Sequence, residues 1–158
     1  MLRRFLIRDG LIVAAAIALW WLVAPLSAGT SWVADLSGWV SGLLLTACAY
    51  LAHEWSHYLG AVATGSHAPL GTRLSTAFLF SFDAETNSLL QFVVMSISGF
   101  VATALAVWLF YTALPDAWLA TRVARGGVVF LSLLGFVLEL PLLVYGIVTG
   151  GVPKQVSV

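Results

Sequence analysis

The chain has 158 residues, of which 61% are hydrophobic and only 9% are charged, and its formal net charge is zero. Soluble domains carry roughly 25% charged residues, so a water-soluble fold of this size could not bury so much apolar surface, and lipid must be its solvent. The balanced charge and the lack of a basic block argue against nucleic acid as a partner. The single cysteine, Cys48, excludes an internal disulfide.

Four apolar stretches are each long enough to cross a bilayer, which takes roughly 20 residues. They cover about residues 5–23, 36–63, 89–114 and 123–149. Proline and glycine residues interrupt the chain after the first, third and fourth stretches. The sequence therefore predicts an all-α integral membrane protein with four transmembrane helices, in which residues 1–158 form a single polytopic domain. It contains no signal for an oligomeric state.

Basic residues predict the orientation of the spans. Five lysine and arginine side chains fall on the side of the amino terminus: Arg3, Arg4, Arg8, Arg73 and Lys154. Only Arg122 and Arg125 fall on the other side. By the positive-inside rule, this asymmetry predicts a cytoplasmic amino terminus. We expect a multi-pass protein of a bacterial or archaeal cell membrane.

The first span also has features of a secretory signal peptide. Basic residues precede an apolar run of moderate length, and small residues follow it. Asp9, the pair Trp20 and Trp21, and the lack of a clear A-x-A cleavage site favour a retained span. Cleavage after the first span stays the alternative, and it would leave the other three spans in the same orientation.

The second span contains the sequence His53-Glu54-Trp55-Ser56-His57. On a helix, positions i and i+4 lie on one face, so His53 and His57 can bind one metal ion. Glu54 lies beside them, placed to act on a metal-bound water rather than on the metal. Ionisable side chains this dense are costly in a membrane helix and are functional by default. The motif therefore predicts a Zn²⁺ site with Glu54 as catalytic base, and the alternative is polar packing between helices.

The stretch from Ala52 to Gly65 resembles the site-2 protease family of intramembrane zinc metalloproteases. That family carries H-E-x-x-H followed by small residues and a glycine, which here are Gly60, Ala61, Ala63 and Gly65. The resemblance implies a three-helix protease-like core over about residues 36–150. It implies a zinc-dependent endopeptidase whose substrates are membrane-spanning protein segments. It also implies an aspartate ligand on the third core helix, but the aspartate motif is absent from this chain.

Other functions stay open at this point. One alternative is a catalytically inactive relative that acts as a membrane scaffold or chaperone. The intact Glu54 argues against it, because a scaffold needs no base. Another alternative is a different membrane metallohydrolase. A desaturase-like di-iron enzyme needs many histidines, and three in the whole chain are too few.

Glu139 is the predicted third metal ligand. A catalytic zinc site has three protein ligands and one open position. Counting along the helices at 1.5 Å per residue places His53, His57 and Glu139 at depths of roughly 21, 27 and 20 Å. An unpaired carboxylate deep in the membrane is expensive, and Pro141 indicates a helix break nearby. The alternatives are a protonated Glu139 in polar packing, and Asp83 as the ligand if the linker folds back.

The linker between the second and third spans alternates apolar and other residues from about 73 to 82. Period two predicts a short interfacial strand or hairpin. By the resemblance, such a strand binds extended substrate, with Phe78, Phe80 and Phe82 as substrate-binding residues. An interfacial loop without a substrate role is the alternative.

The third span is predicted to begin at a capping box formed by Ser88 and Gln91. Farther along it, Gly99 and Thr103 lie on faces of small residues, which indicate close helix packing rather than chemistry.

Overall fold

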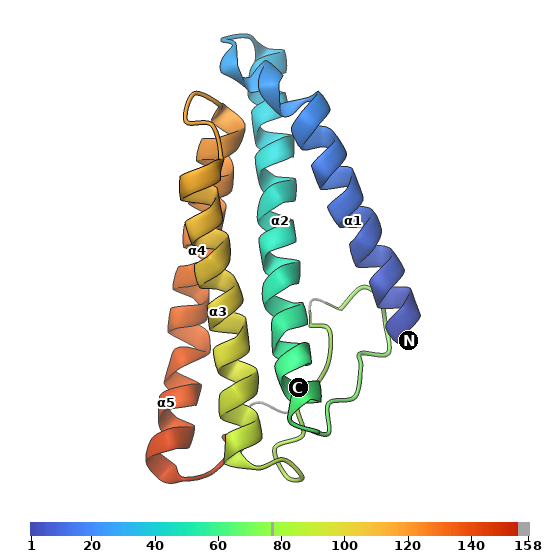
Figure 1. The fold of residues 1–158 in the computed structure, drawn as a ribbon, viewed down its shortest axis with the longest axis vertical. Coiled ribbons are helices and arrows are strands. Elements are labelled where there is room, and N and C mark those ends of the chain that lie inside the picture. Colours follow the sequence, from blue (N-terminus) through green and yellow to red (C-terminus); the bar gives the residue numbers. More distant parts are fainter. Residues whose placement is uncertain (77, 155–158) are drawn as a thin grey trace.

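The computed structural model describes residues 1–76 and 78–154, and its regular structure is helical (Figure 1). The elements in chain order are α1 (Leu2–Leu22), the short 3-10 helix η1 (Ala24–Ala28), α2 (Trp32–Ala63), α3 (Leu89–Ala113), α4 (Leu119–Leu138) and α5 (Leu140–Thr149). Four spans are long and apolar enough to cross a membrane, and α4 with α5 make the fourth, from Leu119 to Thr149. The prediction of four membrane-spanning helices is confirmed by length and composition, and it indicates a multi-pass membrane protein.

Three spans begin three or four residues earlier than predicted: at Leu2, Trp32 and Leu119. α2 begins at Trp32 because the side chain of Ser31 accepts a hydrogen bond from the Ala34 N–H and so caps the helix. The capping box predicted for α3 is present: Ser88 accepts from the Gln91 N–H, and the Gln91 side chain accepts from the Ser88 N–H. Local capping therefore sets helix starts that hydrophobicity alone places only approximately.

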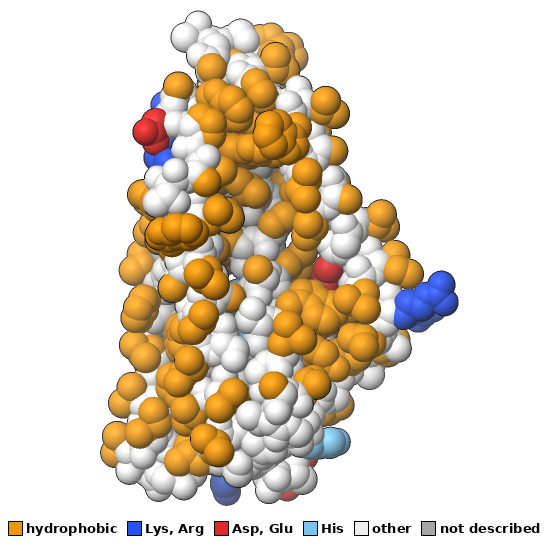
Figure 2. Space-filling view, viewed as in Figure 1, with side chains coloured by type: hydrophobic (Ala, Val, Ile, Leu, Met, Phe, Trp, Pro, Cys, Tyr) orange, Lys and Arg blue, Asp and Glu red, His pale blue; other side chains and the backbone are white. Residues whose placement is uncertain are grey.

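Hydrophobic side chains cover most of the molecular face seen in Figure 2, and charged groups on that face are few. Large apolar residues on every long helix are exposed, among them Leu22, Trp32, Leu105 and Val137. In water such a surface would drive aggregation, whereas in a bilayer it is the lipid-facing surface.

α2 runs through the middle of the bundle, between α1 on one side and α3 and α4 on the other (Figure 1). Glycines let it approach its neighbours closely. A Cβ at Gly42 would lie 2.6 Å from the Val123 Cβ, and one at Gly60 would collide with Ser98. Small residues at these crossings replace the hydrophobic driving force that helices lack in lipid. This tight contact holds the H-E-x-x-H motif, on the C-terminal half of α2, against α3.

The last span is broken at Glu139, as Pro141 predicted. α4 ends at Leu138 and α5 begins at Leu140. Proline has no N–H, so Pro141 cannot continue the hydrogen-bond ladder. The ladder resumes when the Leu143 N–H donates to the Glu139 carbonyl at 3.0 Å. The break falls at the residue whose carboxylate forms part of the site described below.

The predicted interfacial strand or hairpin does not form in the described part of the linker. Residues 64–76 and 78–88 contain one isolated antiparallel bridge, between Leu70 and Phe80. Next to it, the Gly71 N–H donates to the Leu79 carbonyl at 3.0 Å. A bridge of this length is not a strand, so the alternating pattern was a wrong indicator of regular structure.

The physical reason is that side chains bind the neighbouring backbone groups. The Leu79 N–H donates to the Glu54 carboxylate at 3.3 Å. The Thr76 hydroxyl lies 2.8 Å from the Arg73 carbonyl and 3.0 Å from the Phe78 carbonyl, so its proton serves the linker's own turn. Groups bound in this way cannot extend a ladder. The alternation does not match burial either: Leu79 and Phe82, which come from opposite phases of the pattern, are buried, whereas Phe78 is exposed.

Candidate metal centre

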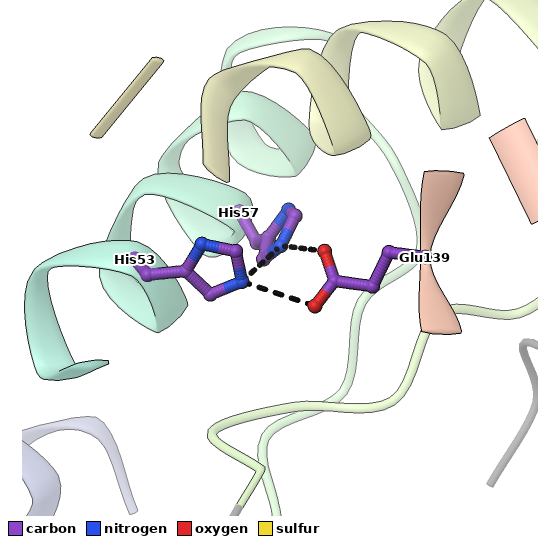
Figure 3. A group of neighbouring side chains, drawn as sticks. All are labelled: His53, His57 and Glu139. Carbon is purple, nitrogen blue, oxygen red and sulfur yellow. Dashed lines mark hydrogen bonds and ion pairs between the residues drawn. The ribbon is translucent and has the colours of Figure 1, made fainter. Parts of the chain in front are cut away.

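Three side chains from two distant parts of the chain, His53, His57 and Glu139, point toward one another (Figure 3). His53 and His57 lie one turn apart on α2, and their Nε2 atoms are 2.9 Å apart. The Glu139 carboxylate reaches both from the α4–α5 break, with Oε1 at 3.2 Å from His53 Nε2 and Oε2 at 3.2 Å from His57 Nε2. Both imidazoles are 12% exposed and the carboxylate is 36% exposed. The centre is therefore enclosed except on the side of Glu139.

Backbone carbonyls of α3 orient the two imidazoles. His57 Nδ1 lies 2.8 Å from the Met95 carbonyl, and His53 Nδ1 lies 3.1 Å from the Gly99 carbonyl. Thr103 Oγ1 also lies 2.8 Å from His53 Nδ1. Because a carbonyl only accepts, each Nδ1 must carry the proton and donate. Each Nε2 of a neutral imidazole then directs its lone pair toward the other Nε2 and the carboxylate.

This arrangement fits a metal ion. Three electron-pair donors, His53 Nε2, His57 Nε2 and the Glu139 carboxylate, converge within 4.8 Å of one another. Without a cation, their lone pairs would repel. Ligand atoms about 2.0–2.1 Å from a tetrahedral zinc ion would lie about 3.3 Å apart, close to the spacing found here. Among the residues that the structure describes, these three form the one group of this kind that could hold a metal ion.

Glu54 lies beside this group but does not belong to it. Its side chain is buried, and it accepts the hydrogen bond from the Leu79 N–H at 3.3 Å. It lines the same cavities as Glu139. A carboxylate that is next to the ligands, fixed by a backbone donor and open to a cavity can exchange protons with a molecule bound there.

Two cavities meet at the centre, one of about 190 Å³ and one of about 280 Å³. Glu54, Phe78 and Glu139 line both of them. The smaller cavity is otherwise mainly aromatic and apolar, lined by Phe80, Phe82, Phe92, Met95 and Leu142 among others. The larger one is aliphatic, lined by Ala49, Leu131, Leu134 and Leu138 among others. An apolar chain could therefore extend to either side of the polar centre.

The three predicted substrate-binding phenylalanines differ in their surroundings. Phe78 is exposed and lies between the two cavities. Phe80 lines the smaller cavity and pairs with Leu70. Phe82 also lines it, but its ring is buried against Phe92, with the ring centroids 6.0 Å apart. Phe78 and Phe80 are thus better placed than Phe82 to contact a bound molecule.

Asp83, the alternative ligand, is not at the centre. It stays in the linker, where its Oδ2 lies 3.1 Å from His67 Nδ1. Hydrogen bonds from Thr86 and from the Glu85 N–H lower the pKa of Asp83 to about 2. Asn87 closes the same loop through two hydrogen bonds with the His67 backbone. These contacts stabilise the linker and leave Glu139 as the carboxylate facing both histidines.

Sequence reasoning missed the contribution of α3. Met95 and Gly99 act through backbone carbonyls, for which a side-chain pattern contains no signal. Thr103 was assigned to helix packing, although a hydroxyl four residues beyond Gly99 was a signal that α3 presents polar groups to α2. The partners that fix the tautomers of ligating histidines are as much a part of a metal site as the ligands.

Gly99→Ala should weaken metal binding by about 10- to 100-fold, the range found when groups that orient ligating histidines are disturbed. A Cβ at Gly99 would collide with the His57 imidazole and displace it. Gly126→Ala is the matched control, because a Cβ there meets nothing within 4 Å. Competition with a chromogenic chelator would measure zinc affinity in both variants. If Gly99→Ala bound zinc as tightly as the wild type, metal binding would not depend on the present position of the His57 imidazole.

The comparisons with known proteins returned no match: no family model, no curated protein and no solved structure corresponds to this chain.

Proposed function

We propose that this protein is a zinc-dependent intramembrane endopeptidase that hydrolyses peptide bonds in membrane-spanning segments of other proteins. One observation carries the proposal: a His53–His57–Glu139 group that could hold a metal ion lies beside the buried carboxylate of Glu54. Three ligands leave one position open on a tetrahedral ion, as in catalytic rather than structural zinc sites. The resemblance of residues 52–65 to site-2 proteases points to the same chemistry.

The ligands would be Nε2 of His53, Nε2 of His57 and the carboxylate of Glu139. A zinc ion held there would polarise the scissile carbonyl and make a water molecule acidic enough to ionise near neutral pH. The α3 carbonyls keep both imidazoles in the tautomer that ligation requires. The remaining chemistry is proton transfer.

Glu54 is the residue for that transfer. It accepts a proton from the attacking water as the water oxygen bonds to the carbonyl carbon. It then donates this proton to the amide nitrogen as the carbon–nitrogen bond breaks and the amine leaves. The Leu79 N–H, which donates to Glu54, holds the carboxylate in place during both steps.

The substrate would lie along the two cavities, in extended form. A helical segment hides its backbone, so it must unwind before hydrolysis. Apolar side chains on either side of the scissile bond would occupy the aliphatic and the aromatic cavity. Phe78 and Phe80 would contact the substrate directly, and Phe82 would support them.

With the amino terminus cytoplasmic, as the basic residues predict, the centre would lie toward the cytoplasmic side of a bacterial or archaeal cell membrane. Cleavage would then release the cytoplasmic part of a substrate. This function requires three partners: Zn²⁺, a membrane-spanning protein substrate and the surrounding lipid bilayer.

The test is reconstitution. The full-length protein is placed in liposomes with a panel of single-span peptides, and the products are identified by mass spectrometry. We expect cleavage inside the apolar segment, stopped by a zinc chelator and restored by added zinc. Capture of peptides without cleavage would identify a scaffold instead. Hydrolysis of lipid esters alone would identify another metallohydrolase.

A further inference from the structure

Asp9 is a buried carboxylate on α1 that the proposed chemistry does not use. It is only 5% exposed, although α1 otherwise presents mainly apolar residues to lipid. Both carboxylate oxygens are bound: Arg8 Nε donates to Oδ1 at 2.6 Å, and Trp55 Nε1 donates to Oδ2 at 2.8 Å. Trp55 stands inside the H-E-x-x-H motif, directly after Glu54. Asp9 is therefore bonded to the helix that carries the metal centre, on the side away from the histidines.

Arg8 extends this contact to the linker. A second N–H of its guanidinium donates to the backbone carbonyl of Leu74. The guanidinium also lies over the ring of Phe5, 4.8 Å from its centroid, and Phe5 is fully buried. In Figure 1 the linker passes through the space between the N-terminal half of α1 and the C-terminal half of α2. The Arg8–Asp9 pair thus binds α2 and the linker at once.

A row of aromatic rings gives a second connection. The rings of Trp55 and Tyr58 are 5.9 Å apart at their centroids, and those of Tyr58 and Phe80 are 5.5 Å apart. Phe80 lies next to Leu79, whose N–H binds Glu54. Asp9 is therefore connected to the residues that cover the centre through Trp55 and, with Arg8, through Leu74.

Apolar packing between α1 and α2 is incomplete near Asp9. A cavity of about 320 Å³ separates α1 from α2 beside these contacts, lined by Asp9, Gly10, Cys48 and Trp55 among others. At this loosely packed part of the interface, the polar contacts of Asp9 and Arg8 join α1 to α2 and to the linker. Charged groups in a membrane are costly, and an apolar pair could join two helices at lower cost. A carboxylate and a guanidinium, however, can bind an indole N–H and a backbone carbonyl together.

We propose that Asp9 is a positioning residue for the metal centre: through Trp55 and Arg8 it uses α1 to hold the linker against Glu54. The effect on cleavage rests on the proposed function, whereas the effect on the linker does not. Loss of the Asp9 contacts should loosen the amides of Gly71, Leu79 and Ser81, which are hydrogen-bonded in and beside the Leu70–Phe80 bridge. It should leave the three metal ligands in place.

The experiment is hydrogen exchange on the full-length protein in lipid nanodiscs. Asp9→Leu removes both acceptors and should speed exchange of the three linker amides by about tenfold, the effect of losing one charge-assisted hydrogen bond. Trp55→Phe removes one donor and should give a smaller increase. Both substitutions remove the same hydrogen bond, so the double variant Asp9→Leu/Trp55→Phe should exchange its linker amides little faster than Asp9→Leu alone. The matched control is Asp35→Leu, which removes an exposed carboxylate near the start of α2 and should change nothing in the linker.

Two further readouts separate positioning from general stability. Zinc content and the exchange of α3 amides should match the wild type in Asp9→Leu. In the cleavage assay kcat should fall severalfold, because the Leu79 N–H would hold Glu54 less firmly, and Asp9→Glu should restore part of the loss. Unchanged linker exchange, or equal acceleration in every helix, would overturn the proposal. Faster linker exchange in a protein that cleaves nothing would support the positioning role and contradict the proposed function.

Discussion

Glu54→Gln should reduce peptide cleavage by about 10²- to 10⁴-fold, the usual contribution of a general base, while zinc content stays the same. Glutamine has the size of glutamate, and its carbonyl oxygen can still accept the Leu79 N–H. It cannot, however, accept a proton from water at neutral pH. Because Glu54 is not among the three side chains that converge on the candidate site, the metal should not depend on it. Cleavage rate and bound zinc are measured on the same preparation.

The control for this variant is Glu85→Gln, the same substitution at an exposed residue of the linker. It should cleave at the wild-type rate. If Glu54→Gln lost its zinc, Glu54 would be a ligand and the division of roles within the motif would be wrong. If it kept full activity, another group would have to carry the proton.

Glu139→Ala should lower the affinity for zinc by more than about 100-fold, because removing a direct ligand weakens binding more than disturbing a group that orients a ligand. Two imidazoles with Nε2 atoms 2.9 Å apart then remain without the carboxylate whose oxygens lie 3.2 Å from them. Glu139→Asp keeps the charge but shortens the side chain by one methylene, so it should bind zinc with intermediate affinity. Zinc affinity is measured by chelator competition, and cleavage should fall in the same order.

Asp83→Ala is the discriminating control for Glu139. Asp83 pairs with His67 in the linker and does not reach the centre. Its removal should leave zinc affinity within about twofold of the wild type, since substitutions away from a site have small effects. Zinc bound normally by Glu139→Ala, but lost from Asp83→Ala, would reverse the assignment of the third ligand.

Sequence patterns sufficed for the helical framework because the bilayer imposes a length on every apolar segment. They located the four spans, the capping box at Ser88 and the break before Pro141. Depth along the helices also placed Glu139 level with the histidines, and the structure brings its carboxylate within 3.2 Å of both imidazoles. Its role as a ligand stays a prediction. Counting residues along a helix gives depth in a membrane because spans that cross the same bilayer begin and end at the same two surfaces.

The linker and the surroundings of the motif could not be predicted in the same way. The alternation from Leu74 to Phe82 does not match which side chains are buried, and Glu54 takes the Leu79 N–H that a strand would need. The contact between Asp9 and Trp55 joins residues 46 positions apart. It depends on how α1 meets α2, which no local pattern encodes. Such polar contacts between helices are specific to the tertiary structure.

The central claim is that His53, His57 and Glu139 bind one zinc ion. Elemental analysis of the full-length protein, purified in mild detergent with zinc present and then dialysed, tests it most directly. A site with these three ligands should retain about one zinc per chain. The His53→Ala/His57→Ala double variant, folded to the same helix content, should retain almost none. A wild-type protein without zinc, or a double variant that keeps it, would contradict the account.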